Sequence, residues 1–313
     1  MNYIFFTTVI AIGASGIVAQ VLIFRELLVS FYGNELILGI ILANWIILEA
    51  SGVYLAGKAI DKIKNKISLF FILQITFSVA LPLSIYLSRA FKSVLGIPFG
   101  EGIGISAIFW VSFFIILFPG FCHGALFSTI TKLFSLPRPF VKGQGSEIKE
   151  SVGQIGRTYA LETIGTIIGG VILTYLFIPY LNSFQIVFII AIANLAACLF
   201  FFNSLQKNTV FLKYLVLIAL VFFIFLSGNT DKIQRFSVKK QWGMLEVLDY
   251  RNSVYGNIAV VKKEGQYTFF HNGIPIITTP YPDITFVEEF GNLPLLFHPE
   301  PKDVLILSAG AGD

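Results

Sequence analysis

The strongest constraint on this chain is a series of long apolar stretches. A helix that crosses the hydrocarbon core of a bilayer needs about 20 consecutive, mostly apolar residues. The stretches that meet this test are 3–24, 35–55, 67–87, 103–130, 159–180, 184–202 and 210–227. Because lipid offers no hydrogen bonds to the backbone, each stretch is expected to be a helix. The sequence therefore predicts an all-α transmembrane bundle of about seven helices over residues 1–228.

The composition agrees with a location in the membrane. Hydrophobic residues make up 56% of the chain and charged residues 13%, whereas a soluble domain is about 25% charged. The mean hydropathy is +0.80. The net charge of +4 indicates basic loops and no nucleic-acid partner. The first stretch lacks a basic leader and a small-residue cleavage site, so we expect a retained helix in a multi-pass protein of the cell membrane.

Two local features refine the predicted bundle. The fourth stretch is long and contains Pro119-Gly120, where a kink or a break is expected. Small residues recur at four-residue spacing: Gly52 with Ala56, and Gly165 with Gly169. Such pairs let helix backbones approach closely in lipid, so helix packing is their expected role.

Two arguments predict opposite orientations of the chain in the membrane. Basic residues gather in the loops after the second and fourth stretches: Lys58, Lys62, Lys64 and Lys66, and Lys132, Arg138, Lys142, Lys149 and Arg157. The positive-inside rule places both loops in the cytoplasm, and seven crossings then leave the carboxyl-terminal segment outside. A nucleotide-type cofactor, suggested by the end of the chain, belongs inside. On that argument we expect the soluble tail to be cytoplasmic.

Several polar side chains lie at membrane depth, where they are costly and usually face the bundle interior or a cavity. They are Arg25, Glu26, Asn44, Glu49, Gln74, His123 and Glu162. Pairing of Arg25 with Glu49 or Glu162 would relieve this cost. One interpretation is a path for a substrate or a proton, and the other is polar pairing between helices.

A metal site is not predicted in this region. His123 follows Cys122, but no second ligand occurs at helical spacing. Cys122 and Cys198 both lie in apolar stretches and are expected to act as small hydrophobic residues, with no disulfide.

After Gly228 the pattern changes to that of a small soluble domain, assigned to residues 229–300. Segments 239–249, 255–262, 266–271 and 274–278 are expected strands. Glu264-Gly265 and Asn272-Gly273 are expected turns of an antiparallel β unit. Asp283 is the expected N-cap of a helix over 284–297, which His298 to Pro301 would end.

Residues 301–313 have the pattern of a buried strand that enters a glycine-containing loop. The apolar run 304–307 is followed by Ser308, Ala309, Gly310, Ala311, Gly312 and Asp313. Small residues allow backbone N–H groups to approach a ligand closely, at the carboxyl end of a parallel strand. We interpret this segment as the first strand and loop of a Rossmann-like α/β domain.

The order of several short segments points to a family. They are 13–16 with Gln20 and Arg25, 156–165, 253–258, 271–273, 288–290, 293–295, 298–302 and 304–312. Together they resemble the polyamine aminopropyltransferase (spermidine synthase) family, in a form fused to an N-terminal multi-helix membrane region. The family's fold is a small β domain followed by a Rossmann-like methyltransferase-type domain, and by this resemblance the chain stops at the start of the second.

The resemblance implies transfer of an aminopropyl group from decarboxylated S-adenosylmethionine to an amine such as putrescine. Residues Ser308 to Asp313 would hold this co-substrate, or S-adenosylmethionine itself, and no metal is implied. Tyr255, Asn272 and Glu288 are candidates for the acceptor side. The carboxylate base would lie beyond residue 313, so the catalytic residues are unknown and this chain alone is expected not to catalyse the transfer.

The chain departs from the family pattern at several positions. Gly256 replaces a glutamine, Asn272 replaces an aspartate, and Phe286-Val287 replaces a Tyr-His pair before Glu288. These changes concern the acceptor more than the fold. The alternative function is a membrane transporter or scaffold whose tail docks a second polypeptide. Either function leaves room for a second chain that completes the domain, or for a homo-oligomer.

Overall fold

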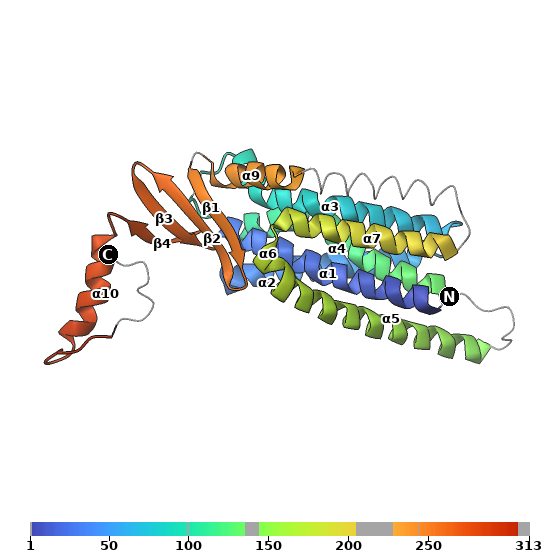
Figure 1. Cartoon of the computed structure of the whole chain (residues 1–313). Coiled ribbons are helices and arrows are strands. Elements are labelled where there is room, and N and C mark those ends of the chain that lie inside the picture. The colour runs from blue at the N-terminus through green and yellow to red at the C-terminus, as the bar shows by residue number, and fades with distance from the viewer. Residues whose placement is uncertain (1, 99, 135–143, 205–227, 244, 306–313) are drawn as a thin grey trace.

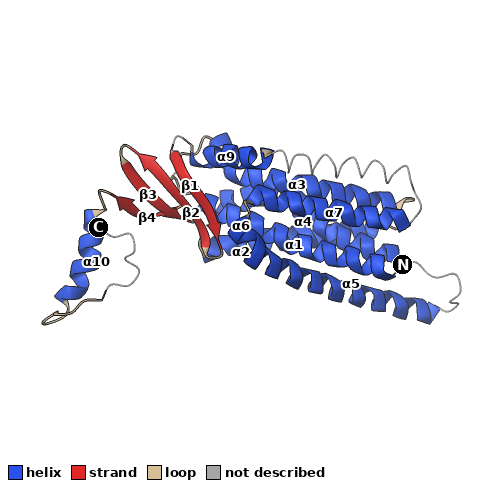
Figure 2. Ribbon diagram, in the orientation of Figure 1, coloured by secondary structure: helices blue, strands red, loops and turns tan. Residues whose placement is uncertain are grey.

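The structure is a computed structural model that describes residues 2–98, 100–134, 144–204, 228–243 and 245–305. Long helices run side by side in an elongated bundle, and a β-sheet lies at one end of it (Figure 1). The N-terminus lies at the opposite end of the bundle. The last helix lies beyond the sheet, away from the bundle (Figure 2).

Six described helices are long and apolar enough to cross a membrane. Their bounds are α1 (Asn2–Phe31), α2 (Glu35–Ala59), α3 (Lys66–Val94), α4 (Ile105–Phe134), α5 (Gln144–Ile172) and α7 (Ser183–Ser204). A π-helical turn η1 (Leu173–Phe177) and the short α6 (Ile178–Tyr180) extend α5. The first six predicted stretches are confirmed as helices, consistent with a membrane protein. The seventh, 210–227, lies outside the described residues.

Capping side chains mark where α2 and α3 begin. Asn34 begins α2 and Asn65 begins α3, and each side chain accepts a backbone hydrogen bond of 3.2 Å from the residue three positions later. These contacts satisfy donors that the first helical turn leaves free. Helix α4 is continuous through Pro119, so the break considered at Pro119-Gly120 does not occur.

Glycines allow two pairs of helices to approach closely. Between α2 and α4, a Cβ on Gly52 would overlap the carbonyl oxygen of Phe121. Between α1 and α5, a Cβ on Gly165 would overlap the carbonyl oxygen of Ile10, and Gly169 lies against the backbone of α1. Lipid tails are as apolar as the helices, so close contact of this kind is what favours association. The packing role predicted for these glycines is confirmed.

The part of the chain after the bundle begins with a helix that the sequence pattern did not predict. Helix α9 (Asn229–Trp242) takes up the first residues of the predicted strand 239–249. Val238 and Trp242 are four residues apart and pack in one cluster with the sheet, which is helical spacing. The strand prediction was wrong here because the polar-apolar alternation was too short to exclude a helix. Strand β1 therefore runs over Glu246–Ser253.

The four strands form one antiparallel meander in the order β1-β2-β3-β4. The remaining strands are β2 (Gly256–Lys263), β3 (Gln266–His271) and β4 (Ile274–Thr279). The predicted turns are confirmed, since Glu264, Gly265, Asn272 and Gly273 all have positive φ angles between 50° and 85°. Two-residue turns of this kind match the twist of the strands they join.

The sheet has a small core of its own, separate from that of the bundle. Ala259 and Val261 from β2 and Phe270 from β3 are buried with Val238 and Trp242 of α9. The rings of Trp242 and Phe270 meet edge to face with centroids 4.8 Å apart. Helix α9 also lies along α3 of the bundle (Figure 1), so it links the two parts.

Helix α10 (Ile284–Leu296) confirms the predicted last helix. The side chain of Asp283 accepts a hydrogen bond of 3.3 Å from the backbone N–H of Phe286, as an N-cap does. The helix buries none of its side chains. Of the predicted strand 304–307 only Val304 and Leu305 are described, and they lie outside any helix or strand. The glycine loop, Ser308 to Asp313, lies outside the described residues.

Candidate functional site in the helix bundle

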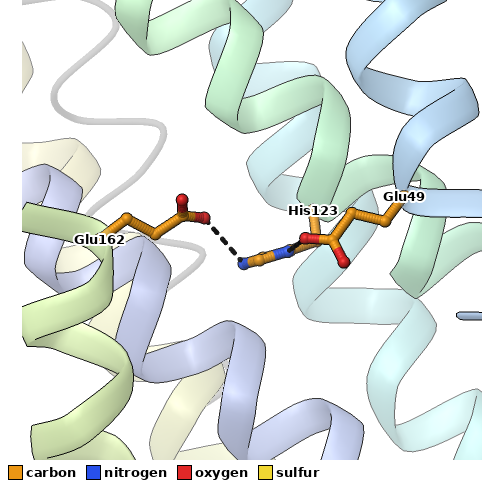
Figure 3. A group of neighbouring side chains, drawn as sticks. All are labelled: Glu49, His123 and Glu162. Carbon is orange, nitrogen blue, oxygen red and sulfur yellow. Dashed lines mark hydrogen bonds and ion pairs between the residues drawn. The ribbon is translucent and has the colours of Figure 1, made fainter. Parts of the chain in front are cut away.

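Three ionisable side chains from three helices meet inside the bundle (Figure 3). His123 of α4 stands between Glu49 of α2 and Glu162 of α5. Its Nδ1 lies 2.7 Å from Oε1 of Glu49, in hydrogen-bond contact. Its Nε2 faces Oε1 of Glu162 at 3.7 Å, which is too long for a hydrogen bond. We call these residues the Glu–His–Glu cluster.

The three side chains of the cluster are buried to different degrees. The exposed fraction of the side chain is 9% for His123, 16% for Glu162 and 31% for Glu49. The imidazole is therefore buried, while the two carboxylates reach toward the outside of the bundle. Trp45 donates a hydrogen bond of 2.9 Å to Oε2 of Glu49, and Phe77 of α3 packs near the imidazole. Both oxygens of Glu49 are thus held, whereas Nε2 of His123 has no hydrogen-bond partner among the described residues.

Three glycines make this meeting sterically possible. A Cβ on Gly124 would overlap the carbonyl oxygen of Glu49, and one on Gly13 would overlap that of Glu162. A Cβ on Gly16 would overlap Nε2 of His123 itself. Because each member of the cluster has a glycine opposite it, helices α1, α2, α4 and α5 can all approach the imidazole.

The cluster has the donor types of a metal site but a different arrangement. One ligand atom from each residue lies within 4.8 Å of the others. However, Glu49 and Glu162 stand on opposite sides of the imidazole (Figure 3), and Nδ1 is already bonded to Glu49. Metal ligands converge on one point. The search for a second ligand at helical spacing could not have found this group, because its members come from separate helices.

A second buried ionic cluster joins the bundle to the soluble part. The guanidinium of Arg89 on α3 forms two hydrogen bonds with Glu26 on α1, of 2.7 and 2.6 Å. Its other nitrogen donates to Gln234 at 2.8 Å and to Ser237 at 2.7 Å, both on α9. Ser183 of α7 accepts from Arg89 at 3.3 Å and donates to Glu26 at 2.6 Å. All five N–H donors of the guanidinium are therefore bonded.

Tyr250 of β1 also contacts Arg89. The ring of Tyr250 lies 5.4 Å from the guanidinium of Arg89, close enough for a cation–π contact. Burial, with a further effect of the Glu26 carboxylate, raises the pKa of the Tyr250 phenol. The phenol donates to Gln241 at 3.4 Å, and Gln241 donates to Ser30 of α1 at 3.0 Å. We call the contacts around Arg89 the Arg89 joint.

Arg25 does not pair with Glu49 or Glu162, as was considered from the sequence. Its guanidinium donates to the backbone carbonyls of Ser253 at 2.6 Å and Gly256 at 3.2 Å. The carboxylates of the Glu–His–Glu cluster have His123 as their ion-pair partner. Arg25 therefore holds the β1–β2 turn against α1, and sequence spacing could not reveal this because the partners are backbone atoms more than 200 residues away.

The predicted acceptor-side residues fall into two groups. Tyr255 and Asn272 lie in turns at the same end of the sheet, and Tyr255 is 88% exposed. The side chain of Asn272 accepts a hydrogen bond of 2.8 Å from the backbone N–H of Asn257, so it closes the turn. Glu288 lies on the exposed helix α10, which follows the other end of the sheet. The predicted co-substrate residues, Ser308 to Asp313, lie beyond the part of the chain that is described.

Sequence reasoning missed Arg89. The predicted third stretch ended at residue 87, so Arg89 was placed beyond the membrane, whereas α3 continues to Val94. The available signal was Glu26, a charged residue placed at membrane depth, which required a buried partner. Comparison of the chain with known protein families, curated proteins and solved structures finds no match.

Proposed function

We propose that this chain is the membrane region and N-terminal β module of an aminopropyltransferase-like protein. The reaction is transfer of an aminopropyl group from decarboxylated S-adenosylmethionine to an amine such as putrescine. The proposal rests on the resemblance of the sequence, and one feature of the fold supports it.

That feature is the way two of the resembling segments, 253–258 and 271–273, join. The backbone N–H of Asn257 donates to the side chain of Asn272 at 2.8 Å, and the N–H of Asn272 donates to the carbonyl of Asn257 at 2.9 Å. The side chain of Asn257 also bonds the carbonyl of Arg251 and the side chain of Asn252. Segments that are 15 residues apart thus form one unit at the end of the sheet nearest the bundle, as expected if they act together.

The chemistry assigns different tasks to different parts of the chain. The acceptor amine attacks a carbon next to a sulfonium, so it must be deprotonated by a base and held by acidic or aromatic groups. In this proposal Tyr255 supplies an exposed aromatic ring on the acceptor side, whereas Glu288 on α10 follows the other end of the sheet and does not share that position. Ser308 to Asp313 hold the co-substrate. The general base is not among the residues that this proposal assigns.

The bundle has a positioning role in the same proposal. Arg25 and Arg89 fix the β module to α1 and α3 through hydrogen bonds of 2.6 to 3.2 Å. A module held in this way would present its turns at the membrane surface, and we assign that surface to the cytoplasm, where a nucleoside co-substrate is found.

The test is the polyamine content of cells that lack the gene. We expect loss of one aminopropylated amine, recovery on re-expression, and poor recovery with Tyr255→Ala. Tyr281→Ala is the matched control, since Tyr281 is also exposed but lies outside the resembling segments. An unchanged polyamine profile in the deletion strain would contradict the proposal.

A further inference from the structure

The Glu–His–Glu cluster has no part in the proposed transfer and lies inside the bundle. Its imidazole has one carboxylate at each ring nitrogen, on opposite sides (Figure 3). Neutral imidazole carries a proton on one nitrogen and a lone pair on the other, so it can accept a proton on one side and release one on the other. From this geometry we infer that Glu49, His123 and Glu162 form a proton-transfer relay across the bundle, from α5 through α4 to α2.

The charges in the cluster favour an exchangeable proton. With both carboxylates ionised and the imidazole protonated, the net charge is minus one, which is costly among apolar helices. One additional proton makes the cluster neutral. Both ion pairs recorded for these carboxylates, within the described part of the chain, are with His123. The charge of the cluster therefore favours binding of one additional proton.

Among the described residues, the ion pairs of the imidazole are with the two carboxylates alone, and the backbone of Ile12 on α1 is a further polar neighbour. Helix α1 presents Gly16 to Nε2, α2 presents Trp45 beside Glu49, and α3 presents Phe77 to the ring. On α3, Gln74 and Ser78 flank Phe77 in sequence. Their buried side-chain oxygens have no hydrogen-bond partner among the residues that the structure covers. Neither group carries a charge.

The transfer step is balanced and needs no other reactant. The O–H bond of a protonated Glu162 breaks and an N–H bond forms at Nε2 of His123. The N–H bond at Nδ1 breaks and an O–H bond forms on Oε1 of Glu49. One proton has then moved from Glu162 to Glu49, with no change in oxidation state. For a second transfer in the same direction the ring rotates, so that the nitrogen that now carries the proton faces Glu49.

One contact must shorten for the step to occur. The distance between Nε2 and Oε1 of Glu162 is 3.7 Å, and a hydrogen bond needs about 2.7–3.2 Å. The distance on the Glu49 side, 2.7 Å, already meets this requirement. The hydrogen bond is thus already formed between His123 and Glu49 on α2, but not between His123 and Glu162 on α5. Movement of α5 toward α4 by less than about 1 Å forms the second bond.

The experiment measures proton flux in vesicles. The purified chain is reconstituted into phosphatidylcholine vesicles that contain a pH-sensitive dye, and a potassium gradient with valinomycin drives protons inward. We expect acidification with the unaltered chain, and a rate about 100-fold lower with Glu162→Gln, the lower end of what a positioned acid–base group contributes. Glu35→Gln, at the exposed start of α2, is the matched control and should keep the full rate.

Glu162→Gln is chosen because it keeps the side-chain volume and removes no recorded hydrogen bond. Circular dichroism and gel filtration check that it folds; His123→Gln is a second variant with the same expected loss of flux. A rate for the unaltered chain equal to that of Glu162→Gln or of protein-free vesicles would overturn the inference. So would stoichiometric metal in the chain purified without chelators that is absent from Glu162→Gln, since the group would then be a metal site.

Discussion

The bundle contains two buried ionic clusters that differ in how completely they are satisfied. In the Arg89 joint every N–H of the guanidinium has an acceptor, and the partners come from α1, α7 and α9. In the Glu–His–Glu cluster one nitrogen of the imidazole has no hydrogen bond within the described residues. A saturated network fixes one geometry, whereas an unsatisfied group can gain or lose a proton. The difference indicates a structural role for the first cluster and a chemical role for the second.

The largest expected effect is that of Arg89→Met. The change leaves Glu26 buried without its partner, which costs about 3–5 kcal/mol in the free energy of unfolding. Chemical denaturation of the detergent-solubilised protein measures it, and Arg235→Gln on the exposed side of α9 is the control. The double variant Glu26→Leu, Arg89→Met should recover most of the loss, because both charges are gone. Equal stability of Arg89→Met and the unaltered protein would contradict the structural role of the Arg89 joint.

Arg25→Gln should loosen the β module with a smaller effect. The variant loses two hydrogen bonds to neutral backbone carbonyls, which together are worth about 1–3 kcal/mol net. Hydrogen exchange at the β1–β2 turn should accelerate, while exchange in the bundle should not change. Arg251→Gln is the matched control, since Arg251 is exposed and its side chain, within the described residues, pairs with the nearby Asp249. Slow exchange at that turn in Arg25→Gln would show that other contacts hold the module.

Gly16→Ala tests the packing on which the Glu–His–Glu cluster depends. The added methyl group overlaps Nε2 of His123, and such overpacking costs about 1–3 kcal/mol. Gly39→Ala in α2 is the control, because nothing lies within 4 Å of its added Cβ. Thermal unfolding should separate the two variants. Equal unfolding temperatures for the two variants would contradict the close packing of Gly16 against His123.

Much of the fold was predictable, because it depends on local patterns. Apolar length identified the first six stretches, and the Asn272-Gly273 turn identified a hairpin. The helix α9 was missed because alternation over residues 239–249 also fits a helix that places Val238 and Trp242 on one face. The extent of α3 was underestimated, so Arg89 was not considered as the partner of Glu26.

The candidate site was predictable only as a set of unusual residues. Glu49, His123 and Glu162 were recognised as costly at membrane depth, but which of them meet depends on how each helix is rotated about its axis. That rotation is set by tertiary contacts such as Gly16 against His123 and Gly124 against Glu49. No spacing along the chain encodes these contacts directly, which is why Arg25 was considered as a partner when its acceptors lie in the sheet.

The most direct test measures unfolding and proton flux together in two carboxylate variants. Glu26→Gln should lower the unfolding temperature and leave the flux of the folded protein unchanged. Glu162→Gln should change the free energy of unfolding by less than about 1 kcal/mol, since it loses no hydrogen bond, and should abolish the flux. The opposite pattern, or equal effects of both variants on both quantities, would contradict the assignment of separate roles to the two clusters.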